Sequence, residues 1–207
     1  MNDSASVRST GTDHTARVRA IAGRDWPAIT ALEARAYGHL GLTEGQAALR
    51  AWRDASPETC FAVHIGPRLA GYVLALPYPH GSYPDLRRAR AATTGRAVVP
   101  ARNLHLHDLV VAPELRRQGL ARHLLRQLCA VARSRAYERV SLVSVGGAEA
   151  FWSARGFSAH PGVVPPGGEY GANAVYMSLP LGTSPPGTSP PGKSLPGKLE
   201  KSDVRVP

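Results

Sequence analysis

The spacing of hydrophobic positions along the chain predicts an α/β protein with a mixed central sheet flanked by helices. Short runs of alternating apolar and polar residues, rich in β-branched side chains, are typical of strands. Longer runs with apolar residues three and four positions apart are typical of amphipathic helices. The clearest strand is expected at residues 104–111. The clearest helix is expected at residues 118–135, with one apolar stripe of Leu120, Leu124, Leu125, Leu128 and Val131.

The remaining elements follow the same two periods. One helix is expected to begin at Asp25, whose side chain can cap it ahead of Pro27, and another at Thr43, with Gln46 reaching back. A hairpin is expected at 61–65 and 69–76, followed by a long irregular loop at 77–103. Further strands are expected at 17–21, 139–145, from 157 onward and at 175–181, with a short helix at 147–155. The predicted order is β-α-α-β-β-β-α-β-α-β-β.

Composition divides the chain into one domain and two extensions. Residues 1–16 are polar and expected to be disordered, and residues 17–181 carry the periodicity of a folded domain. Residues 182–207 repeat GTSPP, GTSPP and GKSLP, which is too rich in proline and glycine to build a core. The N-terminus lacks an apolar signal segment, and no run of about 18 apolar residues occurs. A cytoplasmic protein without a membrane partner is therefore expected, with Cys60 and Cys129 as reduced core residues.

The formal net charge of +10 indicates an anionic partner, either a nucleic acid or a cofactor with several phosphates. A nucleic-acid-binding protein is an alternative from another class, but the sequence lacks an aromatic and basic stripe or a recognised binding motif. We therefore expect no nucleic-acid partner. The lysines, Lys193, Lys198 and Lys201, all lie in the tail. This placement excludes a Schiff-base lysine from the predicted domain.

A candidate anion-binding turn lies between the clearest strand and the clearest helix, with the sequence RRQGLA at residues 116–121. The start of a helix leaves about four backbone N–H groups without partners and carries the positive end of the helix dipole. Anions bind at such ends, and glycine permits close approach of the backbone to a ligand. The turn can therefore hold phosphate, although Arg-X-X-Gly-X-Ala alone is also found at ordinary helix starts.

With the preceding LHLHDLVVAPEL, this turn resembles the R/Q-X-X-G-X-G/A signature of the GCN5-related N-acetyltransferase (GNAT) superfamily. GGAEAFWSARGF at residues 146–157 resembles that family's later helix and Gly-Phe turn, and a looser resemblance spans 17–181. It implies an acyl-CoA N-acyltransferase fold with splayed central strands, and acetyl-CoA as the acyl-donor substrate with no metal. The residues implied to contact pantetheine are Leu109, Val110 and Val111. Those implied around the pyrophosphate are Arg116, Arg117, Gln118, Gly119, Leu120, Ala121 and Arg122.

Two histidines, His105 and His107, are expected on one face of the strand because successive side chains alternate. Three interpretations compete for them. Neutral histidine can take a proton from an ammonium substrate, directly or through water. Two histidines also suit zinc, with His64 or His123 as a third ligand. The third interpretation is a hydrogen-bonded structural pair.

The GNAT resemblance favours the catalytic base. His105 lies eleven positions before Arg116, where histone-acetylating members carry their glutamate base. The His-X-His pattern is similar to that of the arylalkylamine (serotonin) N-acetyltransferases, in which both histidines assist deprotonation. Asp108, expected on the opposite strand face, is a secondary catalytic candidate with a salt-bridged aspartate as the alternative. Trp152 stands where many relatives have a tyrosine acid, so that role is unfilled or moves to Tyr170 or Tyr176.

The sequence therefore predicts direct transfer of an acetyl group from acetyl-CoA to the primary amine of a small molecule in a ternary complex. Acetylation of a protein N-terminus or lysine is the alternative among enzymes, and a catalytically silent acyl-CoA-binding module is the alternative outside them. The loop at 77–103 is expected to decide between an open groove for a protein and a closed pocket for a small amine. A homodimer is compatible with these predictions, and the sequence leaves it undecided.

Overall fold

The computed structural model describes residues 15–86 and 101–182. Its strands are β1 (Ala16–Ala20), β2 (Phe61–Ile65), β3 (Arg68–Pro77), β4 (Asn103–Val111), β5 (Arg139–Ser144), β6 (Ser158–His160) and β7 (Val175–Pro180). Its helices are α1 (Trp26–Tyr37), α2 (Gln46–Ala55), α4 (Leu120–Ser134) and α5 (Glu149–Ser153), with 3₁₀ turns η1 (Gly23–Asp25), η2 (Gly38–Leu40), η3 (Pro57–Thr59) and η4 (Pro113–Leu115). The predicted order is confirmed for the described residues.

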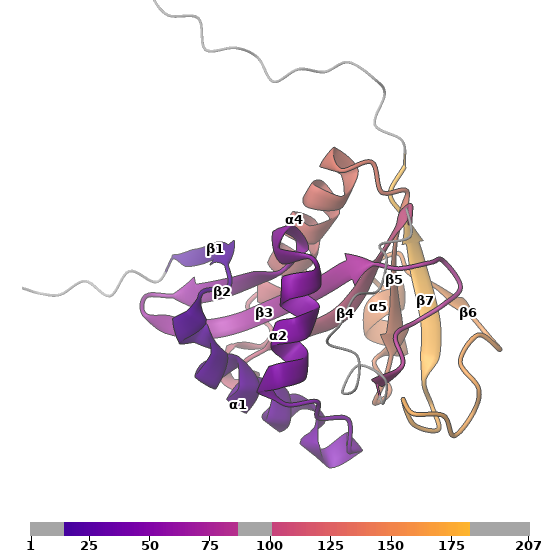
Figure 1. The fold of residues 1–207 in the computed structure, drawn as a ribbon, viewed down its shortest axis with the longest axis horizontal. Helices are drawn as coiled ribbons and strands as arrows, with labels where there is room; N and C mark the ends of the chain where they lie inside the picture. The colour runs from indigo at the N-terminus through magenta and orange to yellow at the C-terminus, as the bar shows by residue number, and fades with distance from the viewer. Residues whose placement is uncertain (1–14, 87–100, 183–207) are drawn as a thin grey trace, which may run out of the picture.

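The strands form one sheet with the order β1-β2-β3-β4-β5-β7-β6 (Figure 1). Neighbouring strands are antiparallel except β4 and β5, which run parallel. This mixed, open sheet confirms the fold class expected from the hydrophobic periods. The predicted N-terminal segment and tail remain predictions, because residues 1–14 and 183–207 lie outside the described residues.

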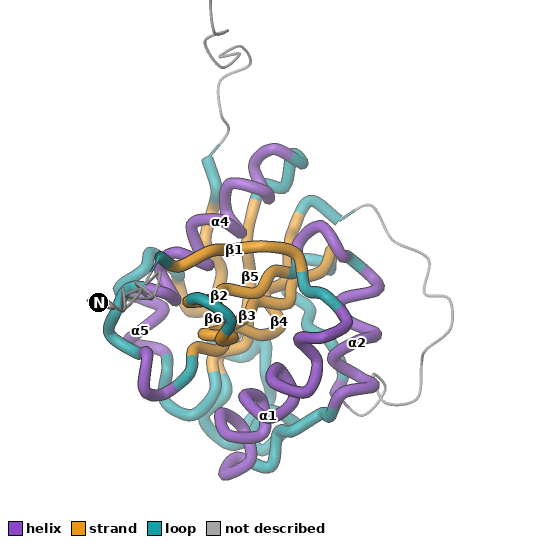
Figure 2. Tube along the Cα trace, turned by 90° about the vertical axis from the view of Figure 1, so that its left-hand side faces the viewer, coloured by secondary structure: helices purple, strands orange, loops and turns teal. Residues whose placement is uncertain are grey.

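Helices cover both faces of the sheet, and each face has its own hydrophobic core (Figure 2). On one face α4 buries Leu124 and Leu128 against the central strands, beside Trp152 and Phe157. On the other face α1 and α2 pack against side chains of β2 and β3, and the buried residues include Trp26, Ile29, Leu49 and Tyr72. The apolar stripes turn inward because burying them removes apolar surface from water. These two layers hold the central strands rigidly between them.

The two parallel strands at the centre of the sheet diverge. β4 and β5 pair at three positions, from Asn103 opposite Arg139 to His105 opposite Ser141. Beyond them β4 continues along β3 as far as Val111, whereas β5 continues along β7 as far as Ser144. The sheet therefore opens between β4 and β5 just beyond His105, and the splayed central strands are confirmed.

The start of α2 differs from the expectation. The helix begins at Gln46 after Gly45, which has a φ of 82°, and Thr43 does not cap it. The buried carboxylate of Glu33 explains the later start, because it accepts the N–H of Glu44 at 2.6 Å and holds the chain before the helix in place. The connection between α1 and α2 thereby turns Glu44 toward the sheet.

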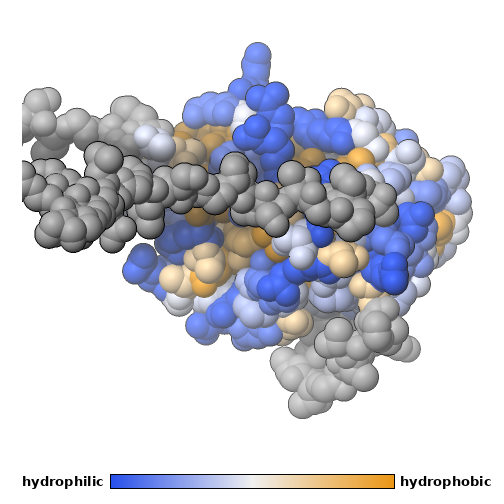
Figure 3. All heavy atoms as spheres, turned by 90° about the horizontal axis from the view of Figure 1, so that it is seen from above, coloured by the Kyte–Doolittle hydropathy of each residue, from blue (hydrophilic) through white to orange (hydrophobic). Residues whose placement is uncertain are grey.

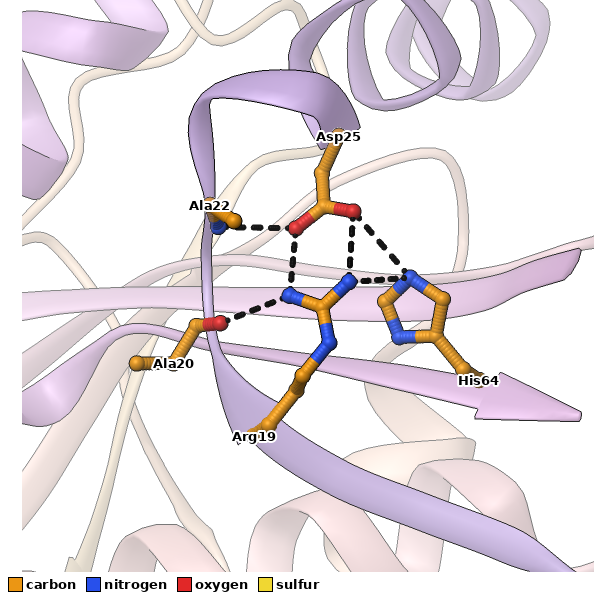
Figure 4. Close-up of polar contacts among 5 residues, drawn as sticks. All are labelled: Arg19, Ala20, Ala22, Asp25 and His64. Atoms are coloured by element: carbon orange, nitrogen blue, oxygen red, sulfur yellow. Dashed lines mark hydrogen bonds and ion pairs between the residues drawn. The ribbon is translucent and has the colours of Figure 1, made fainter. Parts of the chain in front are cut away.

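A charged cluster at the edge of the sheet ties β1 and β2 to the turn before α1 (Figure 4). Arg19 donates two hydrogen bonds to the Asp25 carboxylate, at 2.7 and 2.8 Å, and the Ala22 N–H donates another at 2.8 Å. His64 Nε2 lies 3.2 Å from the same carboxylate. Burial raises the pKa of Asp25, but the Arg19 and Ala22 hydrogen bonds outweigh it and bring the pKa down to about 2. Asp25 therefore links the strands and caps η1, instead of capping α1 as expected.

The substitution Asp25→Asn should lower the free energy of unfolding by about 2 kcal/mol near neutral pH, because it weakens charge-assisted hydrogen bonds to a buried group. The pKa of Asp25 is depressed in the folded state, so its contribution is present above the unfolded pKa of about 3.9 and is lost as the pH falls toward 2. Urea denaturation near neutral pH and in acid measures this change. The matched control is Asp54→Asn, since Asp54 is 62% exposed and pairs with its neighbour Arg53. Equal losses in the two variants near neutral pH would contradict the assignment.

The face drawn in Figure 3 is largely hydrophilic, with small separate apolar areas. Leu40 and Phe151 are the exposed large hydrophobic side chains of the described ranges, and both line the groove described below. None of the helices in those ranges has the length and apolar character needed to cross a membrane.

Cys60 and Cys129 are buried free thiols, as expected.

Candidate active site

A groove of about 1160 Å³ follows the opening between β4 and β5. It runs from β4 across the turn before α4, and its opposite wall consists of the end of β5, α5 and the end of α1. The lining includes every residue that the sequence assigned to the acyl donor: Leu109, Val110, Val111, Arg116, Arg117, Gln118, Gly119, Leu120, Ala121 and Arg122. The structure thus brings these residues into one elongated, arginine-rich groove, which fits a long ligand bearing phosphates.

The turn before α4 has the backbone shape of an anion site. Gly119 is the residue that precedes the helix, and its φ of 81° lies in the left-handed region that glycine adopts without strain. Arg117 also has a positive φ, 66°, which is uncommon for a residue with a side chain. Such strained residues cluster at ligand-binding sites. The turn brings the first residues of α4, with their N–H groups free of partners inside the helix, to the groove wall.

A β-bulge in β4 changes which side chains share a face. Leu74 of β3 pairs with Asp108 and the next residue, Ala75, pairs with Leu106, so His107 is the extra residue. Leu106 and Leu109 both pack in the core on the α4 side. Alternation is therefore interrupted between them, and His107 and Asp108 both face the α1 and α2 side. The expected placement of Asp108 opposite the histidines is wrong because of this bulge.

His107 lines the groove and is held by Glu44. Its side chain is 3% exposed, and its Nε2 lies 2.6 Å from Glu44 Oε1. Trp52 donates from its indole N–H to the other Glu44 oxygen at 2.8 Å, and its ring lies 4.5 Å from the His107 ring. Burial lowers the pKa of His107, but the charge and hydrogen bond of Glu44 outweigh it and raise that pKa above its ordinary value. The Nδ1 atom is buried without a hydrogen-bond partner in the described part of the chain.

His105 is buried behind His107 and shares its strand face. It is 1% exposed, and its Nδ1 lies 3.0 Å from the hydroxyl of Ser141, its partner on β5. Asn103 donates to the same hydroxyl at 2.8 Å. Burial, with a smaller effect of the His107 charge, lowers the pKa of His105 to about 3. His105 is therefore neutral at physiological pH.

Asp108 lies among tyrosine hydroxyls. It is 5% exposed and accepts a hydrogen bond from the Tyr72 hydroxyl at 2.9 Å, and Tyr37 also bonds to it. Burial raises its pKa, although His107 and the tyrosines oppose the change. The alternative of an aspartate salt-bridged near Arg117 is wrong, because Asp108 forms no ion pair with an arginine among the described residues. Tyr37 lines the groove, and reasoning from the sequence had not selected it.

A segment at the start of the long predicted loop packs over the same region of the sheet. We call residues 78–86 the strap; residues 87–100 lie outside the described chain. The N–H of Gly81 donates to the Tyr176 hydroxyl at 3.0 Å, and the Tyr170 hydroxyl donates to the Pro84 carbonyl at 2.8 Å. The Tyr78 ring lies 6.0 Å from that of His105. Both tyrosines suggested as substitutes for the missing acid are thus bonded to the strap, and Trp152 packs between Phe151 and Phe157.

The histidine pair lacks the surroundings of a zinc site in the described residues. His64 contacts Arg19 and Asp25 at the sheet edge, and His123 contacts Arg126 on α4, so neither proposed third ligand lies at the pair. In residues 15–86 and 101–182 no group of three or more His, Cys, Asp or Glu residues is arranged to hold a metal ion. The arrangement around His107 is that of an imidazole oriented by a carboxylate.

The splayed strands and the groove beside them define an acyl-CoA-dependent N-acyltransferase. The sequence profile described as the Acetyltransferase (GNAT) family matches residues 26–157, which is well over half of the 207 residues. The chain belongs to this family. No curated protein sequence matches the chain.

Solved structures with the same fold have names that describe different activities. The loading GNATL domain of CurA from Lyngbya majuscula is 15% identical with a TM-score of 0.65, covering 81% of this chain and 98% of its own. The ribosomal-protein-S18-alanine N-acetyltransferase from Escherichia coli is 16% identical with a TM-score of 0.54. The match covers 84% of this chain and 99% of that enzyme. N-acetylglutamate synthase from Neisseria gonorrhoeae, solved with coenzyme A and N-acetyl-glutamate, is 18% identical with a TM-score of 0.59. The match covers 81% of this chain and 35% of the synthase chain. At these identities the likeness shows the fold and leaves the acceptor open.

Proposed function

We propose that the protein transfers the acetyl group of acetyl-CoA directly to the primary amine of a small molecule, with His107 as the base. The observation that carries this proposal is His107 in the groove lining, with its Nε2 held by Glu44 and its buried Nδ1 without a partner among the described residues. The similarity of the His-X-His pattern to the arylalkylamine N-acetyltransferases supports the same assignment. The cytoplasmic location and the domain limits stay predictions.

The groove supplies the seat for the acyl donor. Acetyl-CoA brings a thioester carbonyl that an amine can attack. The edge of β4 beyond His105 has separated from β5, and its main chain at Leu109, Val110 and Val111 lines the groove. Main-chain N–H groups at such an edge can hold the pantetheine amides and stabilise the oxygen on which negative charge develops. The turn at residues 116–122 would hold the diphosphate by its backbone N–H groups and arginines.

The proton leaves through one nitrogen of His107. When His107 is neutral, Nε2–H donates to the Glu44 carboxylate, so the lone pair is on Nδ1. That nitrogen takes the proton from the substrate ammonium group, directly or through a water molecule. Glu44 then stabilises the imidazolium that results. The neutral amine attacks the thioester carbonyl, so that the C–N bond forms and the C–S bond breaks. Coenzyme A leaves as the thiolate, which takes up the second proton lost by the amine nitrogen. His105 has a pKa too low to hold a proton, so in this proposal it supports β4 through Ser141 and is not a second base.

The acceptor side favours a small cationic amine over a protein segment. The strap is bonded to Tyr170 and Tyr176 and packs over the strand that carries the histidines. Three buried carboxyl groups, Glu33, Glu44 and Asp108, interact electrostatically there in a protein whose net charge is +10. Opposite charges favour an ammonium substrate, and the strap packed beside His105 favours a small one. Acetylation of a protein N-terminus or lysine would instead need space for a peptide chain.

An acceptor panel tests the proposal. The protein is incubated with acetyl-CoA and separate arylalkylamines, diamines, and peptides with a free N-terminus or a lysine, and products are identified by mass. We expect acetylated small amines and unmodified peptides. Acetylation of the peptides alone would replace the small-molecule proposal with the protein-acetyltransferase alternative. Coenzyme A binding without product from any acceptor would favour the silent module.

Gly119→Val should weaken coenzyme A binding by at least about tenfold, because it places a side chain where backbone and diphosphate meet closely. The left-handed φ also costs about 1 kcal/mol of stability. The matched control is Gly162→Val, because Gly162 has a φ of 83° in equally open space and lies outside the groove lining. Calorimetric titration measures both variants. Equal coenzyme A affinities in the two variants would contradict the diphosphate seat.

A further inference from the structure

Four arginines of the groove lining have no acidic partner in the described parts of the chain: Arg116 and Arg117 of the turn before α4, and Arg122 and Arg155. Arg122 lies in the first turn of α4 and Arg155 just after α5, and both line the groove. They are near enough that the Arg122 charge, after the larger effect of burial, helps to lower the pKa of Arg155. Two neighbouring like charges repel each other, and the repulsion is relieved when an anion binds between them.

Four arginines outside the groove lining are paired with carboxylates. Arg35 and Arg68 share Glu114, Arg102 bonds to Glu138, and Arg135 bonds to Glu58. The pair in the groove thus differs from these surface arginines of the described chain. Its position in a groove that fits a phosphate-bearing ligand points to an external anion as the missing partner.

Arg155 is held in a fixed orientation. Its guanidinium lies 3.4 Å from the centre of the Phe151 ring and donates to the Phe151 carbonyl oxygen. Its Nε is buried without a hydrogen-bond partner within the described ranges. A guanidinium is a planar fork that binds phosphate oxygens in pairs, and one that is already oriented loses less entropy on binding. Arg155 is therefore a prepared donor at the mouth of the groove.

We infer that Arg122 and Arg155 form a seat for a phosphate monoester, the phosphate on the ribose of coenzyme A. The inference rests on the proposed function, which places the diphosphate at the turn before α4. The ribose phosphate is the one phosphate of coenzyme A that the diphosphate turn does not take, and it carries close to two negative charges at neutral pH. Arg122 moves by this inference from the diphosphate site to the ribose phosphate. The seat makes the protein select coenzyme A over dephospho-CoA.

Calorimetric titration with coenzyme A and dephospho-CoA tests the seat. The unmodified protein should bind coenzyme A at least about tenfold more tightly, as expected for charge-assisted hydrogen bonds to one phosphate. Arg155→Gln and Arg122→Gln should each weaken coenzyme A binding, reduce this preference to about threefold or less, and leave dephospho-CoA binding unchanged. The matched control is Arg126→Gln on α4, which removes the same charge outside the groove lining and should keep the full preference.

The dephospho-CoA affinity also reports on folding, because a misfolded variant loses both ligands. Equal affinity of the unmodified protein for the two ligands would overturn the seat and leave the proposed function standing. The seat would also be overturned if Arg155→Gln and Arg122→Gln each weakened the binding of coenzyme A and of dephospho-CoA by the same factor. Failure of the unmodified protein to bind either ligand would overturn the proposed function and the seat together.

Discussion

His107→Ala is expected to lower kcat for acetyl transfer by about 10²–10⁴-fold, the usual contribution of a positioned general base. The KM for acetyl-CoA should change little, because the diphosphate turn and the edge of β4 stay intact. The loss arises because the Nδ1 lone pair that receives the ammonium proton is removed. Steady-state kinetics with the best amine of the panel measure the effect.

Two further histidine variants make this result interpretable. His123→Ala removes a histidine of α4 that contacts Arg126 outside the groove lining, and it should keep normal kcat. His105→Gln should act mainly through the Ser141 contact and leave the pH dependence of the reaction in place. A His107→Ala variant with most of its activity would remove His107 from the proposed mechanism.

Glu44→Gln should lower kcat/KM by at least about tenfold and move the rising limb of the pH profile to lower pH. The Glu44 charge and hydrogen bond raise the pKa of His107 against the opposite effect of burial. His107 is therefore protonated below this raised pKa and becomes a base as the pH increases through it. In the unmodified protein kcat/KM should rise with pH through an apparent pKa above the ordinary histidine value of about 6.5. Without the Glu44 carboxylate, burial is opposed only by the charges of Asp108 and Glu33, so the pKa of His107 is lower than in the unmodified protein.

The pH profile of kcat/KM separates this role from a structural one. A residue that only stabilised the fold would change the level of activity without moving the rising limb. Glu58→Gln is the matched control, because it removes a carboxylate that pairs with Arg135 on the surface and should leave the profile unchanged. The same rising limb in Glu44→Gln and the unmodified protein would contradict the pairing of Glu44 with His107.

The elements and the position of the turn before α4 could be predicted from sequence because both depend on local patterns. The apolar stripe from Leu120 to Leu128 predicts helix α4, whose first turn lines the groove. The alternation in residues 104–111 predicts strand β4 beside it. The conformations at Arg117 and Gly119 follow from the same short segment. The resemblance therefore identified the part of the groove lining that comes from β4 and the turn before α4, but not the part that comes from α1, β5 and α5.

Contacts between distant segments could not be predicted in this way. Glu44 is 63 residues from His107, and its position before Gly45 resembled the start of a helix. The bulge at His107 depends on the pairing of β4 with β3, and no residue in β4 alone reveals it. It turned Asp108 to the side of the histidines, contrary to simple alternation. The sequence around Glu44 predicts a helix start with Thr43 and Gln46 as its capping residues, and it gives Glu44 itself no role.

The release of coenzyme A thiol from acetyl-CoA, followed with and without a small primary amine, tests the central claim most directly. The account predicts thiol release that requires the amine, matches the acetylated amine formed, and falls by orders of magnitude in His107→Ala. Release at the same rate without any amine, or binding of acetyl-CoA with no release in the presence of every amine tested, would contradict direct transfer by this site.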